Sequence, residues 1–562
     1  MDPVGCAKAE AGAMSPRFSV LTTVFDPEPA HLKSCLASID AQTYRGPIEH
    51  VIVDDASTRF DIQSLLDELE PRPGRAVIRR SGNGGIVAAS NEALEAATGE
   101  FVVLVDHDDV LAPQALELLV EFLDADPDID VAYSDHDLLR PDGRCASPFY
   151  KPDFSLERLR NHNYITHLVV ARRSVVVDVG GFGAGTDGAQ DHDLLLRLAE
   201  RSGPFAHLPE ILLHWRQSPA SVATDVANKP GAFDREVDVV TAHLERTGIS
   251  ATVETGSYPG LVRIRREVSG KPTVSVVIPT RGSRGRIWGV ERVFVHDAVA
   301  SLMADPDDRC ELEFVVVVDA ASDPLVARGL RRIAGDRLQI VDYDQPFNFS
   351  NKINRGVAAA RGDYVLLLND DTELITPGSV AEMVGLAQQD DVGMVGAKLL
   401  FEDGTLQHGG HLYHGTVSHA LLGWPSAHPG PNRMLAVERE CAGVTAAAAL
   451  LQRDVFNRIG GMNTDFAVNY NDVDLSLTLR AAGYRIVWTP HAAWFHFEQQ
   501  TFEHPVDDNE IVALERRWGA AMRTDPYSNP NLAPGRTDWL ELPLRSGAPP
   551  YEQLGNGRIS WG

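Results

Sequence analysis

The chain has 562 residues, of which 44% are hydrophobic and 23% charged, as in an ordinary globular protein with room for two large domains. A formal net charge of −28 argues against nucleic-acid binding and against a polybasic membrane-surface protein. The five scattered cysteines form neither a disulfide framework nor a Cys-x-x-Cys zinc site, and no apolar run reaches 18 residues. We therefore expect a soluble, cytoplasmic protein with no transmembrane segment and no nucleic-acid partner.

The first half alternates short apolar segments with segments of helical periodicity. Strands are predicted at 18–24, 50–53, 76–78 and 101–105, and helices over 28–42 and up to residue 97. This alternation is typical of a parallel sheet with covering helices. The pattern begins again in the second half, with predicted strands at 273–278 and 314–318.

Composition and periodicity together suggest the domain limits. We expect a disordered N-terminus over 1–16, one α/β domain over 17–220 and another over 272–530. A connector over 221–271 is predicted to hold a helix at 231–246 followed by strands. The tail over 531–562 is rich in Pro, Gly and Asn, which favours irregular structure.

A short acidic cluster ends an apolar run twice. Residues 106–109 read Asp-His-Asp-Asp, and residues 369–371 read Asn-Asp-Asp. Asp108 and Asp371 are separated by the same offset as Asn91 from Asn354 and Gly99 from Gly362. A second pair of segments, Gln190-Asp-His-Asp and Asn471-Asp-Val-Asp, is followed in each half by a histidine at similar spacing. We interpret this order as an internal duplication.

Carboxylates at the end of a buried strand point to a metal–phosphate site. Asp106 and Asp108 are two residues apart, so both can reach one cation, and hard oxygen ligands suit Mg²⁺ or Mn²⁺. The alternative for an isolated Asp-x-Asp is a solvated turn before a helix. The repeated context, with a downstream acid and histidine in each copy, favours the metal interpretation.

Three further features have a structural and a functional interpretation. Asp191 stands at the start of a predicted helix, where it is either a helix cap or a general base. His214 is either a buried histidine beside Trp215 or a metal ligand. The Asn83-Gly84-Gly85 segment is either a turn or a close approach of the backbone to a ligand.

Taken together, the motifs resemble family 2 glycosyltransferases of the GT-A fold. In the first half they are Phe18–Phe25, Val53–Ser57, Asn83–Gly85, Asp106–Asp109, Tyr133–Asp135, Gln190–Asp193 and His214–Arg216. The second half resembles the rhamnosyltransferase-like members through Val276–Thr280, Phe347–Asn351, Leu368–Asp371 and Asn471–Asp474. The resemblance implies an α/β chain of two tandem GT-A domains, the Rossmann-like fold of nucleotide-diphospho-sugar transferases, joined by a short connector.

The resemblance also implies roles for individual residues. The donor would be a nucleotide-diphosphate sugar, bound with Mn²⁺ or Mg²⁺ as the cofactor. Residues implied to contact the donor are Thr23, Phe25, Asp55, Asn83, Gly84 and Asp106 in the first half and Thr280, Asp319, Asn369 and Asp370 in the second. The implied metal ligands are Asp106, Asp108 and His214, then Asp371 and His496. Asp191 and Asp472 would be the bases of an inverting single displacement.

The second copy departs from the family pattern at two positions. Asn369 stands where the first copy has Asp106, and Ala320 stands where it has Asp55. Since alanine cannot accept a hydrogen bond from a nucleobase, we expect nucleotide selection to differ between the halves.

The leading expectation is an inverting glycosyltransferase with two sites, acting on a hydroxyl of a surface glycan, a lipid-linked glycan or a protein. One alternative keeps a single working site and makes the other half an acceptor-binding or assembly module. Another is a non-catalytic sugar-binding or structural protein. Nucleotidyltransferases are disfavoured because no glycine-rich basic loop follows the first strand. The oligomeric state stays open.

Overall fold

The computed structural model describes residues 17–69, 73–217, 232–497, 508–533, 536 and 539–542. These residues form two compact units: the first lies within 17–150 and 165–239, and the second within 151–164 and 240–542. The N-terminus predicted to be disordered and most of the predicted tail lie outside the described residues. The predicted domain limits therefore stay predictions. Within the described ranges, no helix combines the length and apolar composition needed to cross a bilayer.

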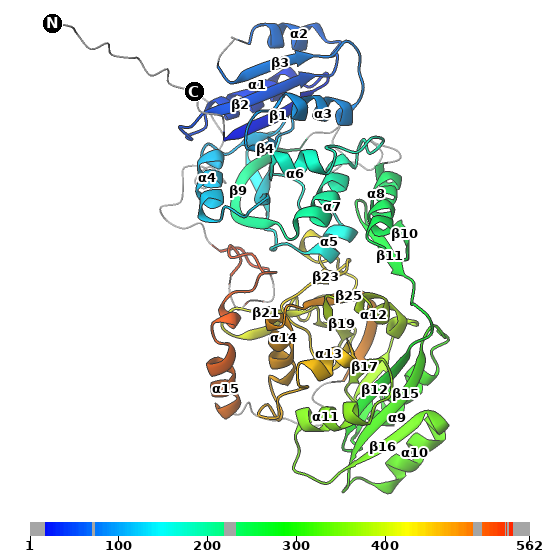
Figure 1. Ribbon diagram of the computed structural model, residues 1–562. Coiled ribbons are helices and arrows are strands. Elements are labelled where there is room, and N and C mark those ends of the chain that lie inside the picture. Colours follow the sequence, from blue (N-terminus) through cyan, green and yellow to red (C-terminus); the bar gives the residue numbers. More distant parts are fainter. Residues whose placement is uncertain are drawn as a thin grey trace, which may run out of the picture. The chain divides into compact units, whose positions relative to one another are not determined.

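The first unit is built on a mixed sheet with the order β3-β2-β1-β4-β8-β6-β9-β5 (Figure 1). Its elements are β1 (Phe18–Val24), α1 (Pro29–Asp40), β2 (Ile48–Asp54), α2 (Phe60–Asp67), β3 (Arg75–Arg79), α3 (Ile86–Ala96), β4 (Phe101–Leu104), β5 (Val110–Leu111), α4 (Ala115–Ala125), β6 (Val131–Leu139), β7 (Cys145–Phe149), β8 (Val169–Arg172), α6 (Arg173–Asp178), α7 (Gln190–Ser202) and β9 (Ala206–Arg216). Strands β1 to β4 pair in parallel, as the sequence predicts, whereas β8 runs antiparallel to β4 and β6.

The second unit repeats this strand order as β16-β15-β12-β17-β24-β19-β25-β18. Its sheet strands and main helices are β12 (Thr273–Thr280), α9 (Phe294–Met303), β15 (Glu311–Asp319), α10 (Pro324–Ala334), β16 (Leu338–Tyr343), α11 (Phe349–Ala359), β17 (Tyr364–Leu368), β18 (Thr372–Leu374), α12 (Ser379–Ala387), β19 (Val392–Leu400), β24 (Ala448–Gln452), α13 (Arg453–Arg458), α14 (Asn471–Ala481), β25 (Arg485–His496) and α15 (Asp508–Trp518). Short strands flank this sheet: β13 (Arg284–Ile287), β14 (Val290–Val293), β20 (Leu406–His408), β21 (His411–Tyr413), β22 (Val417–His419) and β23 (Arg439–Glu440).

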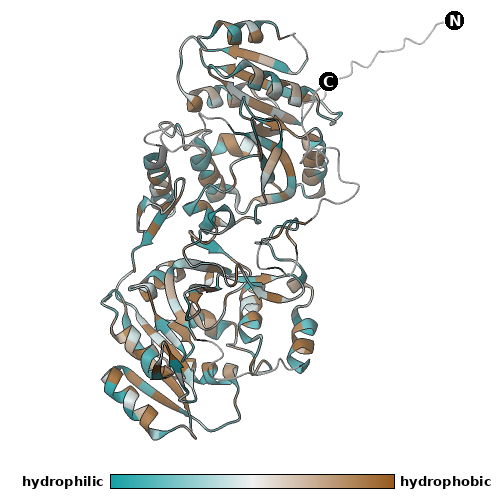
Figure 2. Cartoon of the chain, turned by 180° about the vertical axis from the view of Figure 1, so that it is seen from behind, coloured by the Kyte–Doolittle hydropathy of each residue, from teal (hydrophilic) through white to brown (hydrophobic). Residues whose placement is uncertain are grey.

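Helices cover both faces of the second sheet because its central strands are apolar on both sides. Val276 belongs to a core that includes residues of α9, α10 and α12, whereas its neighbour Val277 belongs to a core that includes residues of α11 and α14. In Figure 2 the strands of this sheet are therefore largely brown (hydrophobic), whereas the helices carry both brown and teal (hydrophilic) residues. The parallel strands end at one edge of this sheet, which is where α/β sheets bind ligands.

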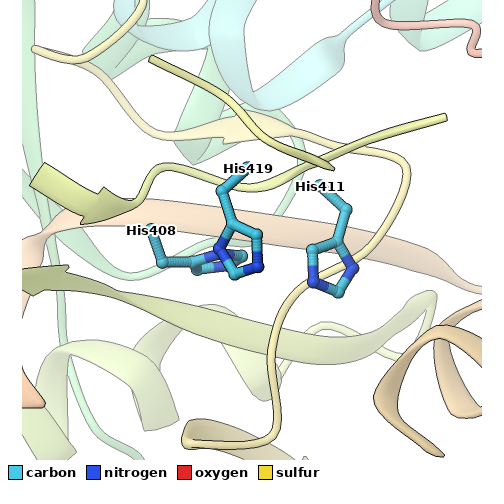
Figure 3. Close-up of side chains that lie close together, drawn as sticks. All are labelled: His408, His411 and His419. Carbon is cyan, nitrogen blue, oxygen red and sulfur yellow. The ribbon is translucent and has the colours of Figure 1, made fainter. Parts of the chain in front are cut away.

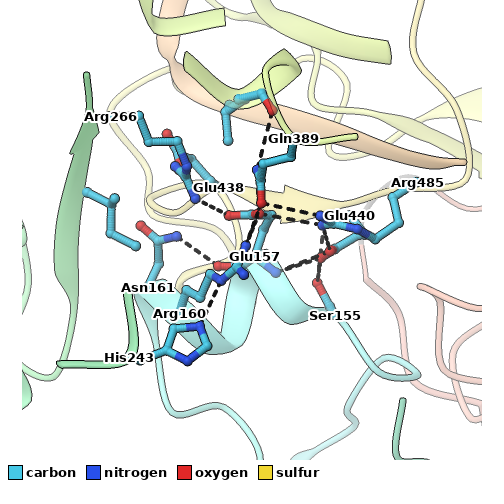
Figure 4. A network of polar contacts seen from close by, with 12 residues as sticks. Ser155, Glu157, Arg160, Asn161, His243, Arg266, Gln389, Glu438, Glu440 and Arg485 are labelled. Atoms are coloured by element: carbon cyan, nitrogen blue, oxygen red, sulfur yellow. Dashed lines mark hydrogen bonds and ion pairs between the residues drawn. The ribbon is translucent and has the colours of Figure 1, made fainter. Parts of the chain in front are cut away.

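A buried ionic network joins helix α5 (Leu156–Asn161) to the rest of the second unit (Figure 4). Glu157 is fully buried and contacts Arg266, Arg160 at 2.6 Å and Arg485 at 3.5 Å. Glu440 accepts hydrogen bonds from Arg485 at 2.6 Å and from the Ser155 hydroxyl at 2.5 Å. Because a buried charge is tolerated only when it is paired, this network fixes where α5 lies.

The segment predicted as a connector forms helix α8 (Ala232–Arg246) and an antiparallel strand pair, β10 (Ala251–Thr255) with β11 (Val262–Arg266). These elements agree with the predicted helix followed by strands.

Candidate functional site

In the first unit, the loop after β2 closes onto the glycine segment. The buried Asp55 carboxylate accepts hydrogen bonds from the Gly84 amide at 2.9 Å and the Gly85 amide at 2.8 Å, and it pairs with Arg80. Gly85 has φ +86, a conformation in which a side chain is strained. Asp55 therefore shapes the loop that carries Asn83 and Gly84.

Thr23 and Phe25, two other residues implied to contact the nucleotide-sugar donor, lie at the carboxyl end of β1. The Thr23 carbonyl is 3.0 Å from Nδ1 of His107, a residue of the acidic cluster. Phe25 is 48% exposed, so its ring is available to a ligand. The first strand and the acidic cluster are thus linked directly.

Two carboxylates of the acidic cluster after β4, those of Asp106 and Asp109, lie close to His167, which the sequence analysis did not single out. Ligand atoms of Asp106, Asp109 and His167 lie within 4.8 Å of one another. Burial raises the pKa of Asp109 well above its ordinary value, and the carboxylates of Asp106 and Asp108 raise it further. Asp109 Oδ1 accepts a hydrogen bond from the Arg216 amide at 2.9 Å, whereas its Oδ2 is buried without a hydrogen-bond partner among the described residues.

Asp191 lies in the first turn of α7, as predicted. The residue at the N-cap position is Ala189, which makes no side-chain capping bond. Asp191 instead lines a small cavity of about 20 Å³ together with Asp106 and His167. The fold thus brings the expected base next to one of the expected metal ligands.

The described side-chain contacts of His214 are with Asp137 and Cys145 and not with the acidic cluster. His214 Nδ1 is 2.6 Å from Asp137 Oδ1 and 3.3 Å from Cys145 Sγ, and all three side chains are buried. The expected set of Asp106, Asp108 and His214 therefore stays a prediction, and His167 Nε2 lies 3.9 Å from Asp106 Oδ2.

In the second unit, a buried lysine organises the carboxyl ends of β12 and β15. The Lys352 ammonium group donates to Asp319 Oδ1 at 2.5 Å and to the Thr280 carbonyl at 2.9 Å. Burial lowers the pKa of Lys352, while the contact with Asp319 opposes that change. An ammonium group has three N–H donors, and these two contacts use two of them. Lys352, Thr280 and Phe347 line a cavity of about 190 Å³.

The acidic segment after β17 meets His496 from β25. His496 Nε2 is 3.2 Å from Asp371 Oδ1 and 3.1 Å from Asn369 Nδ2, and its Nδ1 is 2.7 Å from Gln407 Oε1. Asp370 accepts a hydrogen bond from the Thr280 hydroxyl at 2.6 Å. Burial, together with the Asp371 carboxylate, raises the pKa of Asp370 to about 7. The expected metal residues Asp371 and His496 are thus in contact.

These residues fit a divalent cation. Asn369 Oδ1 is buried and has no hydrogen-bond partner among the described residues. A carboxylate, an amide oxygen and an imidazole are ligands that Mn²⁺ accepts. In the first unit, Asp109 Oδ2 likewise has no hydrogen-bond partner among the described residues, and it lies near Asp106 and His167.

Asp472 lies in the first turn of α14, on the wall of a second cavity of about 310 Å³. Its carboxylate accepts hydrogen bonds from the Val473 amide at 2.9 Å and the Ala446 amide at 3.3 Å. His496 and Asn369 line the same cavity, and Asn369 also lines the cavity that holds Lys352. The two cavities therefore adjoin at the predicted metal residues.

Sequence reasoning missed His167, Lys352 and Gln407. His167 lies in a loop with no periodicity, and Lys352 occupies a helix position where a lysine is normally solvated. Gln407 lies in the three-residue strand β20, which has no motif of its own. Their roles depend on contacts between distant segments.

Comparisons with known proteins agree with this architecture. The model of the family "Glycosyl transferase family 2" matches residues 19–180 and 275–460. The uncharacterized protein y4gI of Sinorhizobium fredii is 36% identical over 541 residues, and the O-antigen biosynthesis protein RfbC of Myxococcus xanthus is 34% identical over 531. Each alignment covers 93% of this chain, which spans 58% of y4gI and 41% of RfbC.

Two more distant matches cover less of the chain. A chondroitin synthase of Pasteurella multocida is 32% identical over 183 residues, which is 32% of this chain and 18% of that protein. The crystal structure of S. aureus TarS 1-349 in complex with UDP-GlcNAc overlaps 41% of this chain and 66% of that chain, with 21% identity and a TM-score of 0.34.

Proposed function

Because this chain belongs to glycosyl transferase family 2 and folds as two tandem GT-A domains, we propose that it transfers a sugar from a nucleotide-diphosphate donor to a hydroxyl acceptor with inversion. The proposed acceptor class is a surface glycan, free or lipid-linked, or a protein. Relatives named for O-antigen biosynthesis and chondroitin synthesis support the glycan choice.

One observation carries the proposal: two cavities in the second unit meet at the predicted metal residues. The smaller one, with Thr280, Lys352 and Asp370, takes the donor nucleotide. The larger one, with Asp472, takes the acceptor. Asn369 lines both, so the donor phosphates and the acceptor hydroxyl come together there.

Asp472 acts as the base in this proposal. The amides of Val473 and Ala446 hold its carboxylate on the wall of the acceptor cavity. It takes the proton of the attacking hydroxyl, which is typically worth about 10²–10⁴ in rate.

Asp371, His496 and the Asn369 amide oxygen would hold Mn²⁺ or Mg²⁺ in the second site. The bound cation would neutralise charge on the departing nucleoside diphosphate. Gln407, at 2.7 Å from His496 Nδ1, fixes the ring so that Nε2 lies toward Asp371.

The first unit offers a second site with Asp191 as base beside Asp106 and His167. A specific observation also supports the alternative that only the second unit transfers sugar. The described His214 contacts are with Asp137 and Cys145, whereas His496 contacts Asp371 directly. In that case the first unit would serve as an acceptor-binding module.

A donor screen tests the proposal. The purified chain is incubated with Mn²⁺ or Mg²⁺, an acceptor glycan and a panel of nucleotide sugars, and the released nucleoside diphosphate is measured. Release with at least one donor is the expected result, reduced in Asp472→Asn, lost in the double variant Asp191→Asn/Asp472→Asn and kept in the exposed control Asp465→Asn. No release with any donor and acceptor would contradict it.

A further inference from the structure

Three histidines from three short strands meet in the second unit (Figure 3). His408 ends β20, His411 begins β21 and His419 ends β22. The antiparallel pairing of β21 with β22 sets His411 directly opposite His419. One ring nitrogen of each histidine lies within 4.8 Å of the other two. The proposed transfer reaction uses none of these rings.

Two rings of the cluster, those of His408 and His411, are buried and held by hydrogen bonds. His408 is 0% exposed and His411 3% exposed. His411 Nδ1 is 3.3 Å from the Tyr413 hydroxyl, which leaves Nε2 as its ligand atom. Burial lowers the pKa of His408 well below its ordinary value and that of His411 to about 4, so both rings are neutral and keep a lone pair.

We propose that His408, His411 and His419 bind a divalent transition-metal ion, with Zn²⁺ as the best fit. Three imidazole nitrogens without a carboxylate form a ligand set of borderline softness, which suits Zn²⁺ better than Mg²⁺ or Mn²⁺. Three protein ligands also leave one position of a tetrahedral ion open. This ligand chemistry distinguishes the cluster from the proposed donor-metal residues, which offer mainly oxygen.

Binding changes two contacts of His408. Its Nδ1 is 2.8 Å from His419 Nδ1, whereas ligand nitrogens around a tetrahedral zinc are about 3.3 Å apart at Zn–N distances near 2.0–2.1 Å. The rings must therefore separate by about 0.5 Å. Ligation through Nδ1 also moves the proton of His408 to Nε2, so the 3.2 Å hydrogen bond from the Thr445 amide must open. The competing state is a metal-free hydrogen bond between His408 and His419.

The cluster borders the proposed acceptor cavity. His419 and Thr445 line that cavity together with Asp472 and His496. An ion held by the three histidines would therefore have its open position near the acceptor side, where water or an acceptor hydroxyl can occupy it.

Metal titration of the purified 562-residue chain tests the site. The chain is stripped with a chelator and then titrated with Zn²⁺ by calorimetry, and with Co²⁺ by visible spectroscopy. We expect His411→Gln and His408→Gln to lose one equivalent of Zn²⁺, or to bind it at least about a hundredfold more weakly, since even supporting contacts are worth 10–100-fold. The exposed control His428→Gln should bind as the wild type does.

Two further variants separate this site from other candidates. Asp371→Asn should keep the equivalent of Zn²⁺ assigned to the histidines, and Cys145→Ser removes any contribution from the cluster of Asp137, Cys145 and His214. Circular dichroism confirms that each variant is folded. Equal Zn²⁺ stoichiometry and affinity in the wild type, His408→Gln and His411→Gln would overturn the proposal and leave a hydrogen-bonded histidine pair. That outcome would leave the proposed transfer reaction standing, because the donor screen tests it independently of the zinc titration.

Discussion

His496 Nε2 lies 3.2 Å from Asp371 Oδ1, although the two residues are far apart in the sequence. The contact forms because β18 pairs antiparallel with β25, with Thr372 opposite His496. The sheet thus assembles the proposed donor-metal residues from two separate motifs.

Asp371→Asn should abolish metal-dependent donor binding in the second site. The change removes the carboxylate charge while keeping the shape, so the fold should persist. Calorimetric titration with a nucleoside diphosphate, with and without Mn²⁺, measures the effect, and Asp390→Asn at an exposed position is the matched control. Undiminished Mn²⁺-dependent binding in a chain whose first site is silenced would reject the assignment.

Lys352→Met should weaken nucleotide binding in the second site. Two of the three lysine N–H donors hold Asp319 and Thr280, and we expect the third to reach a ligand in the cavity that Lys352 lines. A hydrogen bond to a charged group is worth about 1.5–3 kcal/mol, or roughly 10- to 150-fold in affinity. Affinity for uridine and thymidine diphosphates, compared with Lys271→Met at an exposed position, checks this. Equal affinities in both variants would show that Lys352 is structural only.

Nucleotide preference should differ between the two sites. Asp55 offers a carboxylate in the first unit, whereas Ala320 offers none and Lys352 adds a cation in the second. Titrating single-site variants with uridine and thymidine diphosphates measures the preference of each site. Identical affinity and preference in the two sites would refute this asymmetry.

Glu157→Gln should destabilise the second unit by about 3–5 kcal/mol, because it takes the described carboxylate partner from buried Arg160 and one of the carboxylates from Arg266 and Arg485. Burial raises the pKa of Glu157, but Arg266, Arg160 and Arg485 outweigh burial, and the net pKa is lowered. A lowered pKa means that the ionised group stabilises the fold above its ordinary value of 4.5, and that this contribution fades as the pH falls below it.

Urea unfolding followed from pH 7 down to about pH 2.5 tests this, with exposed Glu402→Gln as the control. The wild type should lose stability toward the acid end more steeply than Glu157→Gln. Parallel pH profiles for the two proteins would show that the ionisation of Glu157 does not contribute.

The sequence predicted the parts of the fold that follow local rules. The alternating strands and helices and the position of Asp191 at a helix start agree with the structure. Periodicity and motif order carry that information. The partners of His214, the burial of Lys352 and the docking of α5 into the second unit depend on distant segments, which no local pattern encodes. The histidine cluster was missed for the same reason, since its residues come from strands of three residues each.

The most direct test of the two-site account compares the base variants in one assay of nucleoside diphosphate release. Asp191→Asn and Asp472→Asn should each retain donor binding and lose the activity of one site, and the double variant should fall by at least about 10² relative to the wild type. If only the second unit transfers sugar, Asp472→Asn alone should give the full loss. Near-normal sugar transfer by the double variant would contradict the account.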